Sequence, residues 1–301
     1  MNSLSFLTNL YGKAFSFNKF VDFGFKPVRR FLKLFENIPF SKENISKINQ
    51  IKGRKIPGLI VSLTSFPQRI PNIYKNILSI RNQSVVPEKI ILWLSTEQFP
   101  DKKLPDSLLS LQDDLFEIRF VDGDIRSHKK YYYAFKNFPD KDVITLDDDT
   151  IYHPFTLEYL VNSHLKHPDK IIANTTRFIA IGPEGPEPYL NWKANKKAKQ
   201  DKNLLQIGMG GVLYPKGVMP ELTLNKDLFM SLTPYADDIW LNAMARLNDV
   251  EIVQSENTMN FWEINQKSES LTTANWLEGR NDLQINKVRE YFLTNYNKEI
   301  Y

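Results

Sequence analysis

The pattern of apolar and polar residues changes near residue 57. From there on, short apolar and β-branched runs recur about every 20 to 30 residues, which is typical of buried strands. Because nearly every residue in these runs is apolar, we expect both faces of the sheet to be covered by helices. Strands are predicted at 58–64, 89–94, 116–121, 142–146 and 170–174.

The segments between these runs have the spacing of helices. From Ile70 to Asn82, isoleucines at 70, 73, 77 and 80 share one helical face. Further helices are predicted at 131–138, where Pro139 ends the pattern, and from Pro154 to about Lys166. In contrast, 182–203 is rich in Pro, Gly and Lys and is predicted to be an exposed loop or flap.

Strands that alternate with helices indicate βαβ units, and therefore an α/β fold with a mostly parallel sheet flanked by helices. A length of 301 residues suits one large domain with appendages. We predict a helical N-terminal extension at 1–56, a catalytic domain at 57–265 and a helical C-terminal extension at 266–301.

Composition and charge narrow the class of protein. Hydrophobic residues make up 42% of the chain, cysteine is absent, and no apolar run is long enough to span a membrane. With no recognisable signal peptide, the sequence predicts a cytoplasmic protein. Residues 1–56 carry a net charge of +8 and the remainder −4, so a basic surface around a nucleic-acid site is not expected.

The N-terminal extension combines this positive charge with many phenylalanines. Such a segment is suited to the inner face of an anionic membrane, and we predict contact through residues 1–40. The alternative is a helical hairpin packed on the main domain with its lysines in solvent.

An acidic triplet, Asp147-Asp148-Asp149, follows the predicted strand at 142–146. Side chains alternate in extended backbone, so Asp147 and Asp149 are expected on one face and Asp148 on the other. Two carboxylates at the carboxyl end of a parallel strand predict a site for Mg²⁺ or Mn²⁺. A simple acidic turn is the alternative.

A strand that ends in a D-x-D triplet within a βαβ domain resembles the GT-A (Rossmann-like) glycosyltransferases, of the kind that build bacterial surface polysaccharide or capsule. The resemblance covers about residues 57–265. It implies that the metal at Asp147 and Asp149 holds the diphosphate of a nucleotide-sugar donor, with Asp148 turned toward the donor ribose or the structure.

Two polar loops extend the resemblance. The loop after the first strand, 62–70, is expected to contact the nucleotide, and the loop 122–130 to contact nucleoside and diphosphate. A capping turn and a solvated loop are the respective alternatives. The expected binding residues are Thr64, Ser65, Arg69, Asp122, Arg126 and Lys129, with Lys130 as a further point charge.

Two later segments resemble the acceptor side of these enzymes. The run 208–215 contains Gly210 and Gly211, which are expected beside the donor sugar, or else in a β-bulge. Asp237 and Asp238 open a predicted helix, where the helix dipole alone favours acidic residues. The resemblance assigns Asp238 as the catalytic base, which argues for inversion, and Asp237 as its neighbour; the two roles are interchangeable on sequence grounds, and a retaining enzyme could carry the same acidic pair for binding.

One departure from the family pattern concerns the metal. No histidine lies downstream of residue 208, so the third protein ligand is either absent or another residue, such as Asn260, Glu263 or the upstream His153. The predicted function is metal-dependent transfer of a sugar to a glycan or glycolipid acceptor. A metal-dependent nucleotidyltransferase or phosphotransferase and a non-catalytic sugar-nucleotide-binding module remain the alternatives.

Overall fold

A computed structural model describes residues 53–256, 261–264 and 279–301. The predicted membrane contact through residues 1–40 lies outside these residues, as do Asn260 and the first part of the C-terminal extension. No helix in the described ranges is both long enough and apolar enough to cross a bilayer.

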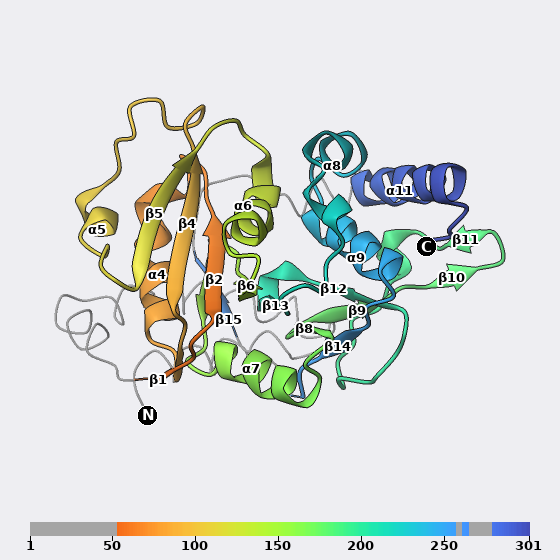
Figure 1. Cartoon of the computed structure of the whole chain (residues 1–301), viewed down its shortest axis with the longest axis horizontal. Helices are drawn as coiled ribbons and strands as arrows, with labels where there is room; N and C mark the ends of the chain where they lie inside the picture. Colours follow the sequence, from red (N-terminus) through yellow and green to blue (C-terminus); the bar gives the residue numbers. More distant parts are fainter. Residues whose placement is uncertain (1–52, 257–260, 265–278) are drawn as a thin grey trace, which may run out of the picture.

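A seven-stranded sheet forms the centre of the fold, in the order β14-β8-β13-β6-β2-β4-β5 (Figure 1). All strands run parallel except β13, which is antiparallel to both of its neighbours. The predicted mostly parallel α/β fold is therefore confirmed. The strands are β2 (Leu59–Thr64), β4 (Lys89–Ser95), β5 (Phe116–Val121), β6 (Asp142–Thr145), β8 (Ile171–Ala173), β13 (Val212–Tyr214) and β14 (Ile252–Gln254).

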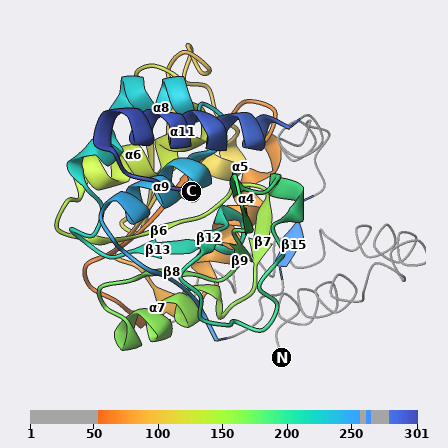
Figure 2. The ribbon, with the colours of Figure 1, turned by 90° about the vertical axis from the view of Figure 1, so that its right-hand side faces the viewer.

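Helices cover both faces of this sheet, as its apolar strands require (Figures 1 and 2). In β2, Val61 packs in the cluster that contains helix α4, whereas its neighbour Ile60 packs against Ala134 of α6. The helices are α4 (Ile70–Arg81), α5 (Asp106–Leu109), α6 (Lys129–Asn137), α7 (Thr156–Lys166), α8 (Lys226–Leu232), α9 (Asp237–Leu247) and α11 (Arg280–Tyr296).

Among the described residues, short strand pairs surround the sheet, one parallel and three antiparallel, and the sequence pattern did not predict them. Strands of two or three residues bury too few apolar positions to show a period, and three of the pairs join segments far apart in the chain. The flap expected at 182–203 contains one such pair. The pairs are β1 (Arg54–Lys55) with β3 (Val85–Val86), β7 (Thr150–Tyr152) with β15 (Phe261–Glu263), β9 (Thr176–Phe178) with β12 (Leu204–Gln206), and β10 (Ile181–Gly182) with β11 (Gly185–Pro186).

The described part of the C-terminal extension is the helix α11, which lies against α8 and α9 (Figure 2). Its apolar side chains Ile285, Val288 and Phe292 are buried in the same cluster as Trp240 of α9. The final residue is also held, because the Tyr301 hydroxyl donates to the carbonyl of Ile239. The extension therefore supports the helix that begins with Asp237 and Asp238.

The order of the strands reverses direction at β2. The chain builds β2, β4 and β5 in one direction and then returns through α6 to place β6 on the other side of β2. At such a reversal the loops that follow the two central strands diverge, and ligands of open α/β sheets bind there. The acidic triplet follows β6 directly, and the loop 62–70 follows β2.

Candidate functional site

The acidic triplet occupies the turn between β6 and β7 and does not continue the strand, because β6 ends at Thr145. Strand alternation is therefore the wrong reason for the orientation of the three carboxylates; the turn orients them. The side chains of Asp147 and Asp149 are 30% and 37% exposed, whereas that of Asp148 is 6% exposed. The two outer carboxylates thus face solvent and the middle one is buried.

Arg69 holds the buried side of this turn. Its Nη1 lies 2.5 Å from Asp148 Oδ1 and 3.0 Å from Asp149 Oδ2, and Ser65 Oγ also donates to Asp148. Burial raises the pKa of Asp148 in spite of the neighbouring Arg69 charge. Ser65 and Arg69 bind the triplet and fix its shape, and their contact with a nucleotide stays a prediction.

Two residues that the sequence did not single out clamp the backbone of the turn. Asn76 Nδ2 donates to the carbonyl of Asp147 at 2.8 Å and to that of Thr150 at 2.6 Å. Tyr152 accepts a hydrogen bond from the amide of Asp147 at 2.8 Å. The one available signal was that Asn76 is a polar residue beside Ile73 and Ile77 on the apolar face of α4.

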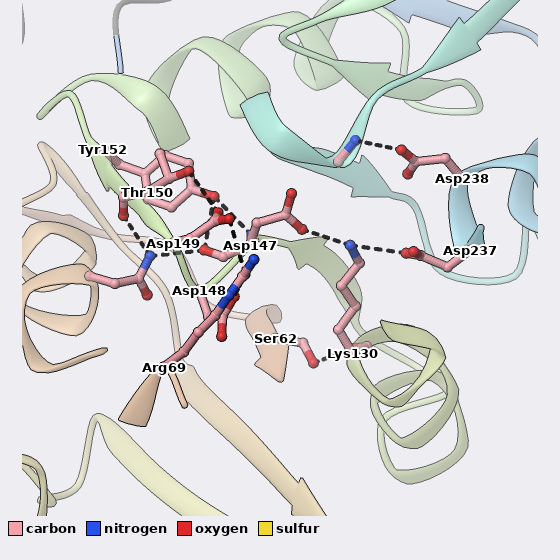
Figure 3. A network of polar contacts seen from close by, with 12 residues as sticks. Ser62, Arg69, Lys130, Asp147, Asp148, Asp149, Thr150, Tyr152, Asp237 and Asp238 are labelled. Carbon is pink, nitrogen blue, oxygen red and sulfur yellow. Dashed lines mark hydrogen bonds and ion pairs between the residues drawn. The ribbon is translucent and has the colours of Figure 1, made fainter. Parts of the chain in front are cut away.

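Lys130, at the start of α6, connects the triplet to the second acidic pair (Figure 3). Its buried Nζ lies 2.8 Å from Asp147 Oδ1 and 2.9 Å from Asp237 Oδ2. Burial opposes the charge of Lys130, but Asp147 and the acidic pair raise its pKa well above the usual value. Residues far apart in sequence therefore meet at one ammonium group.

Asp237 and Asp238 begin helix α9 and have different surroundings. Burial opposes ionisation of Asp237, yet Lys130 holds its pKa below the ordinary value. Burial and the charge of Asp237 together raise the pKa of Asp238 to about 8. Asp238 Oδ2 accepts a hydrogen bond from the amide of Gly208 at 3.1 Å. The pair thus contains one carboxylate that stays charged and one that exchanges a proton near neutral pH.

Gly208 is the glycine around which these groups converge. A Cβ added at Gly208 would lie 3.0 Å from Lys130 Nζ, 3.3 Å from Asp238 Oδ1 and 3.4 Å from Asp147 Oδ1. Gly208 lies in the predicted glycine segment 208–215, but the glycines predicted to lie beside the donor sugar are its neighbours Gly210 and Gly211. Asp147 of the triplet and Asp238 of the acidic pair therefore both border the space beside the Gly208 Cα.

Gly210 and Gly211 serve packing within the described residues. A Cβ at Gly210 would lie 2.6 Å from Thr175 Oγ1, and one at Gly211 would lie 2.7 Å from a methyl carbon of Leu146. Gly211 also has a φ of +88°, which other residues adopt at a cost. The segment leads into β13, so the alternative of a plain bulge is wrong, and Gly210 and Gly211 allow β13 to pass close beside β6 and β8.

In the loop 122–130, the side chains that are predicted to bind nucleoside and phosphate contact other residues of the chain. Lys129 is buried and its ammonium binds Asp124, while Arg126 stacks 3.9 Å over the ring of Tyr235. Asp122 accepts a hydrogen bond from Thr96 at 3.0 Å. Only Arg126 and Asp122 of these side chains are exposed.

Thr64 and two histidines remain to be placed. Thr64 Oγ1 donates to the carbonyl of Trp93 at 2.8 Å, which ties the end of β2 to β4. His128 is fully buried, and burial lowers its pKa to about 4. The His153 ring accepts a hydrogen bond from the Phe155 amide at 3.4 Å and is buried beside that side chain.

The turn after β6 offers carboxylate oxygens as ligands for a metal ion. No group of three or more His, Cys, Asp or Glu side chains that could hold a metal ion occurs in the described part of the chain. Asp147 and Asp149 present two partly exposed carboxylates, which suit Mg²⁺ or Mn²⁺ when a bound phosphate supplies further oxygens. Glu263, a proposed third ligand, pairs with Thr150 through its backbone, so its segment adjoins the triplet.

Comparisons with known proteins give little beyond the fold. No family model matches the chain, and no curated protein matches it. Among solved structures, the chain is similar to 4-diphosphocytidyl-2C-methyl-D-erythritol synthase from Anaerococcus prevotii. The match has 16% sequence identity, covers 76% of this chain and 96% of that one, and has a TM-score of 0.42.

Proposed function

We propose that this chain is a glycosyltransferase that moves a sugar from a nucleotide-sugar donor to a hydroxyl acceptor with the help of Mn²⁺ or Mg²⁺. The observation that carries the proposal is the meeting of Asp147 and the Asp237–Asp238 pair at Lys130, beside Gly208. This meeting occurs at the end of the sheet where α/β folds bind ligands. It brings Asp147, the proposed metal-binding carboxylate, close to Asp238, the proposed base.

Charge explains why a divalent ion would be needed. The site contains three cationic side chains, and each already pairs with a carboxylate. Six aspartates surround them, so a bare diphosphate would meet net negative charge. An ion held by Asp147 and Asp149 would offset this charge and stabilise the departing diphosphate. The aspartates are Asp124, Asp147, Asp148, Asp149, Asp237 and Asp238.

Asp238 is the proposed base for the acceptor. Its carboxylate would take the proton of the acceptor hydroxyl as that oxygen bonds to the anomeric carbon of the sugar. The bond from the anomeric carbon to the diphosphate oxygen breaks in the same step, and the nucleoside diphosphate leaves. A pKa of about 8 makes the deprotonated form of Asp238 a strong carboxylate base whose fraction grows as pH rises toward 8, while Lys130 keeps Asp237 charged beside it. Direct attack of this kind inverts the anomeric configuration.

Nucleotidyl or phosphoryl transfer is the second candidate, because paired aspartates with a divalent ion serve that chemistry as well. At a TM-score of 0.42 and 16% identity, the solved synthase structure does not separate the two reactions. A triphosphate substrate carries more negative charge than a nucleotide sugar. The paired state of Arg69, Lys129 and Lys130 therefore favours glycosyl transfer.

A substrate panel distinguishes these functions. The full chain is incubated with nucleotide sugars, or with nucleoside triphosphates plus sugar phosphates, each with Mn²⁺ and with EDTA. Glycosyl transfer predicts release of nucleoside diphosphate from a nucleotide sugar with Mn²⁺ only. Pyrophosphate release from a triphosphate would establish the second candidate instead, and the absence of binding and turnover for every nucleotide would refute both.

Two substitutions assign the roles within the site. Asp149→Asn is expected to abolish Mn²⁺-dependent donor binding, measured by calorimetry. Asp238→Asn is expected to keep donor binding and lose transfer. Unchanged donor affinity in Asp149→Asn would refute the metal assignment.

The proposal also covers the acceptor and the location of the protein. We infer a glycan or a lipid-linked glycan as the acceptor, in the cytoplasm or at the inner face of the membrane. The basic N-terminal extension supports the peripheral location.

A further inference from the structure

A lysine-rich turn lies outside the site described above. Residues 193–202, here called the lysine turn, contain five lysines and one aspartate, whereas residues 57–301 as a whole carry a net charge of −4. All five ammonium-bearing side chains are exposed, and none forms an ion pair with a residue that the structure describes. The lysines are Lys193, Lys196, Lys197, Lys199 and Lys202.

Buried side chains hold the backbone of the lysine turn. Asn195 is 3% exposed, and its Nδ2 donates to the carbonyl of Lys199 at 2.8 Å while its Oδ1 accepts from the Lys199 amide at 2.9 Å. Just before it, Trp192 is 1% exposed and its Nε1 donates to the carbonyl of Glu187 at 2.8 Å. The turn is therefore anchored from within while its lysines face outward.

Hydrogen bonds and one strand pairing connect the lysine turn to the acceptor side of the site. The Asn195 amide donates to the carbonyl of Thr176 in β9, and Thr176 pairs with Gln206 in β12. Gln206 Nε2 donates to the carbonyl of Asp238 at 3.1 Å. Two strand spacings separate Asn195 from Gln206, which corresponds to about 10 Å. β9 and β12 are adjacent in Figure 2.

We infer that the lysine turn binds an acceptor glycan that carries repeated anionic groups. This inference rests on the proposed function and names the class of its acceptor. Asp147, Asp149, Asp237 and Asp238 make the site itself acidic, and an anionic acceptor would be repelled there. The lysine turn, which the pairing of β9 with β12 connects to the segment beside Asp238, offsets that repulsion and draws such a chain toward the site.

The composition of the lysine turn favours a glycan over a membrane. Ala194 and Ala198 are its only apolar residues. Segments that lie on a bilayer combine basic residues with large apolar side chains that enter the acyl region. The exposed Ile181 and Leu190 belong to the preceding hairpin and helical turn and lie outside the lysine turn. Mobile ammonium groups spaced along a turn match charges spaced along a saccharide.

Binding of a charged saccharide tests the inference. The probes are hexagalacturonate, which carries a carboxylate on each sugar, and neutral maltohexaose, each titrated into the full chain. The test variant is Lys196→Gln/Lys197→Gln/Lys199→Gln. A matched control, Lys103→Gln/Lys136→Gln/Lys216→Gln, removes the same charge from exposed lysines on other elements. Donor binding to the nucleotide sugar is measured in parallel on all three proteins.

Hexagalacturonate is expected to bind the unaltered chain more tightly than maltohexaose, and less tightly at higher salt. The test variant should lose at least about tenfold in affinity, and the control less than about twofold, because each lysine of the turn contributes a direct charge contact. Equal losses in both variants, or no preference for the charged saccharide, would refute the inference. So would binding of phosphatidylglycerol vesicles, but not of hexagalacturonate, through the lysine turn.

The parallel measurements separate this inference from the proposed function. If the chain neither binds nor turns over a nucleotide sugar, the proposed function fails even when the lysine turn binds hexagalacturonate. If donor binding persists in the test variant and hexagalacturonate affinity is also unchanged, only the inference about the lysine turn fails.

Discussion

The Nζ of Lys130 lies 2.8 Å from Oδ1 of Asp147. This contact joins the start of α6 to the turn after β6, and the same ammonium lies 2.9 Å from Asp237 at the start of α9. Lys130 is therefore the counter-charge for both halves of the proposed site. In the absence of a divalent ion it is the buried cation that keeps these carboxylates together.

Lys130→Met should destabilise the protein because it leaves buried carboxylates without their cation. Breaking a buried ion pair in this way costs about 3–5 kcal/mol of unfolding free energy. Urea unfolding at neutral pH measures this cost. Added Mn²⁺ should restore part of the stability of Lys130→Met, since an ion at Asp147 replaces the lost charge. A control substitution, Lys136→Met, changes an exposed lysine of the same helix and should cost little.

Gly208→Ala should reduce activity far more than it reduces stability. The added methyl would crowd Lys130 at 3.0 Å and Asp238 at 3.3 Å, in the space between the proposed metal and base. Small displacements of reacting groups cost up to about 10²-fold in rate. We expect kcat/KM with a nucleotide sugar to fall at least about tenfold. Gly182→Ala is the control, because its new Cβ would make only ordinary contacts.

Asn76→Ala should loosen the triplet and weaken Mn²⁺ binding. Asn76 donates to two carbonyls of the turn; without it the Asp147 carbonyl keeps only the Tyr152 hydroxyl at 3.2 Å, and loss of a buried donor of this kind costs about 1–3 kcal/mol. Calorimetric titration of Mn²⁺ in the presence of a nucleoside diphosphate measures the effect. A variant that is less stable but binds Mn²⁺ with unchanged affinity would contradict a positioning role for Asn76.

Asp238 should make stability depend on pH. Its folded pKa of about 8 lies above the usual 3.8, so the folded protein holds a proton that the unfolded chain releases. The resulting stability is fully present below about pH 4 and is lost as pH rises through about 8. Relative to the wild type, Asp238→Asn should therefore become more stable as pH rises over this range. Parallel stability curves for the two proteins between pH 5 and 9 would contradict the raised pKa.

His128 should also make stability depend on pH, but here stability is lost as the pH falls. Its folded pKa of about 4 lies below the usual 6.5, so its contribution to stability is present above about pH 6.5 and is lost as pH falls through about 4. The neutral ring donates from Nε2 to the carbonyl of Thr233 at 2.7 Å and stacks on Phe229. His128→Gln should flatten the acid limb of the unfolding free energy, measured by urea titration at several pH values.

The main strands and helices followed from sequence because each is long enough to show its period. The predicted strand at 116–121 coincides with β5, and the predicted helix from Ile70 to Asn82 differs from α4 by one residue. The antiparallel direction of β13 did not follow, because three residues behind a glycine run give no direction. Pairing with β6 and β8 decides it.

The α/β class, the position of the acidic triplet after a buried strand and the acidic pair at the start of α9 can all be predicted from sequence. These are local properties, set by apolar period and residue type. The folded structure is needed to see that Arg69 holds Asp148, that Lys130 joins Asp147 to Asp237, and that Gly208 lies beside Lys130 and Asp147. Each of these contacts joins segments separated by many residues, and the packing of strands and helices alone brings them within hydrogen-bonding distance.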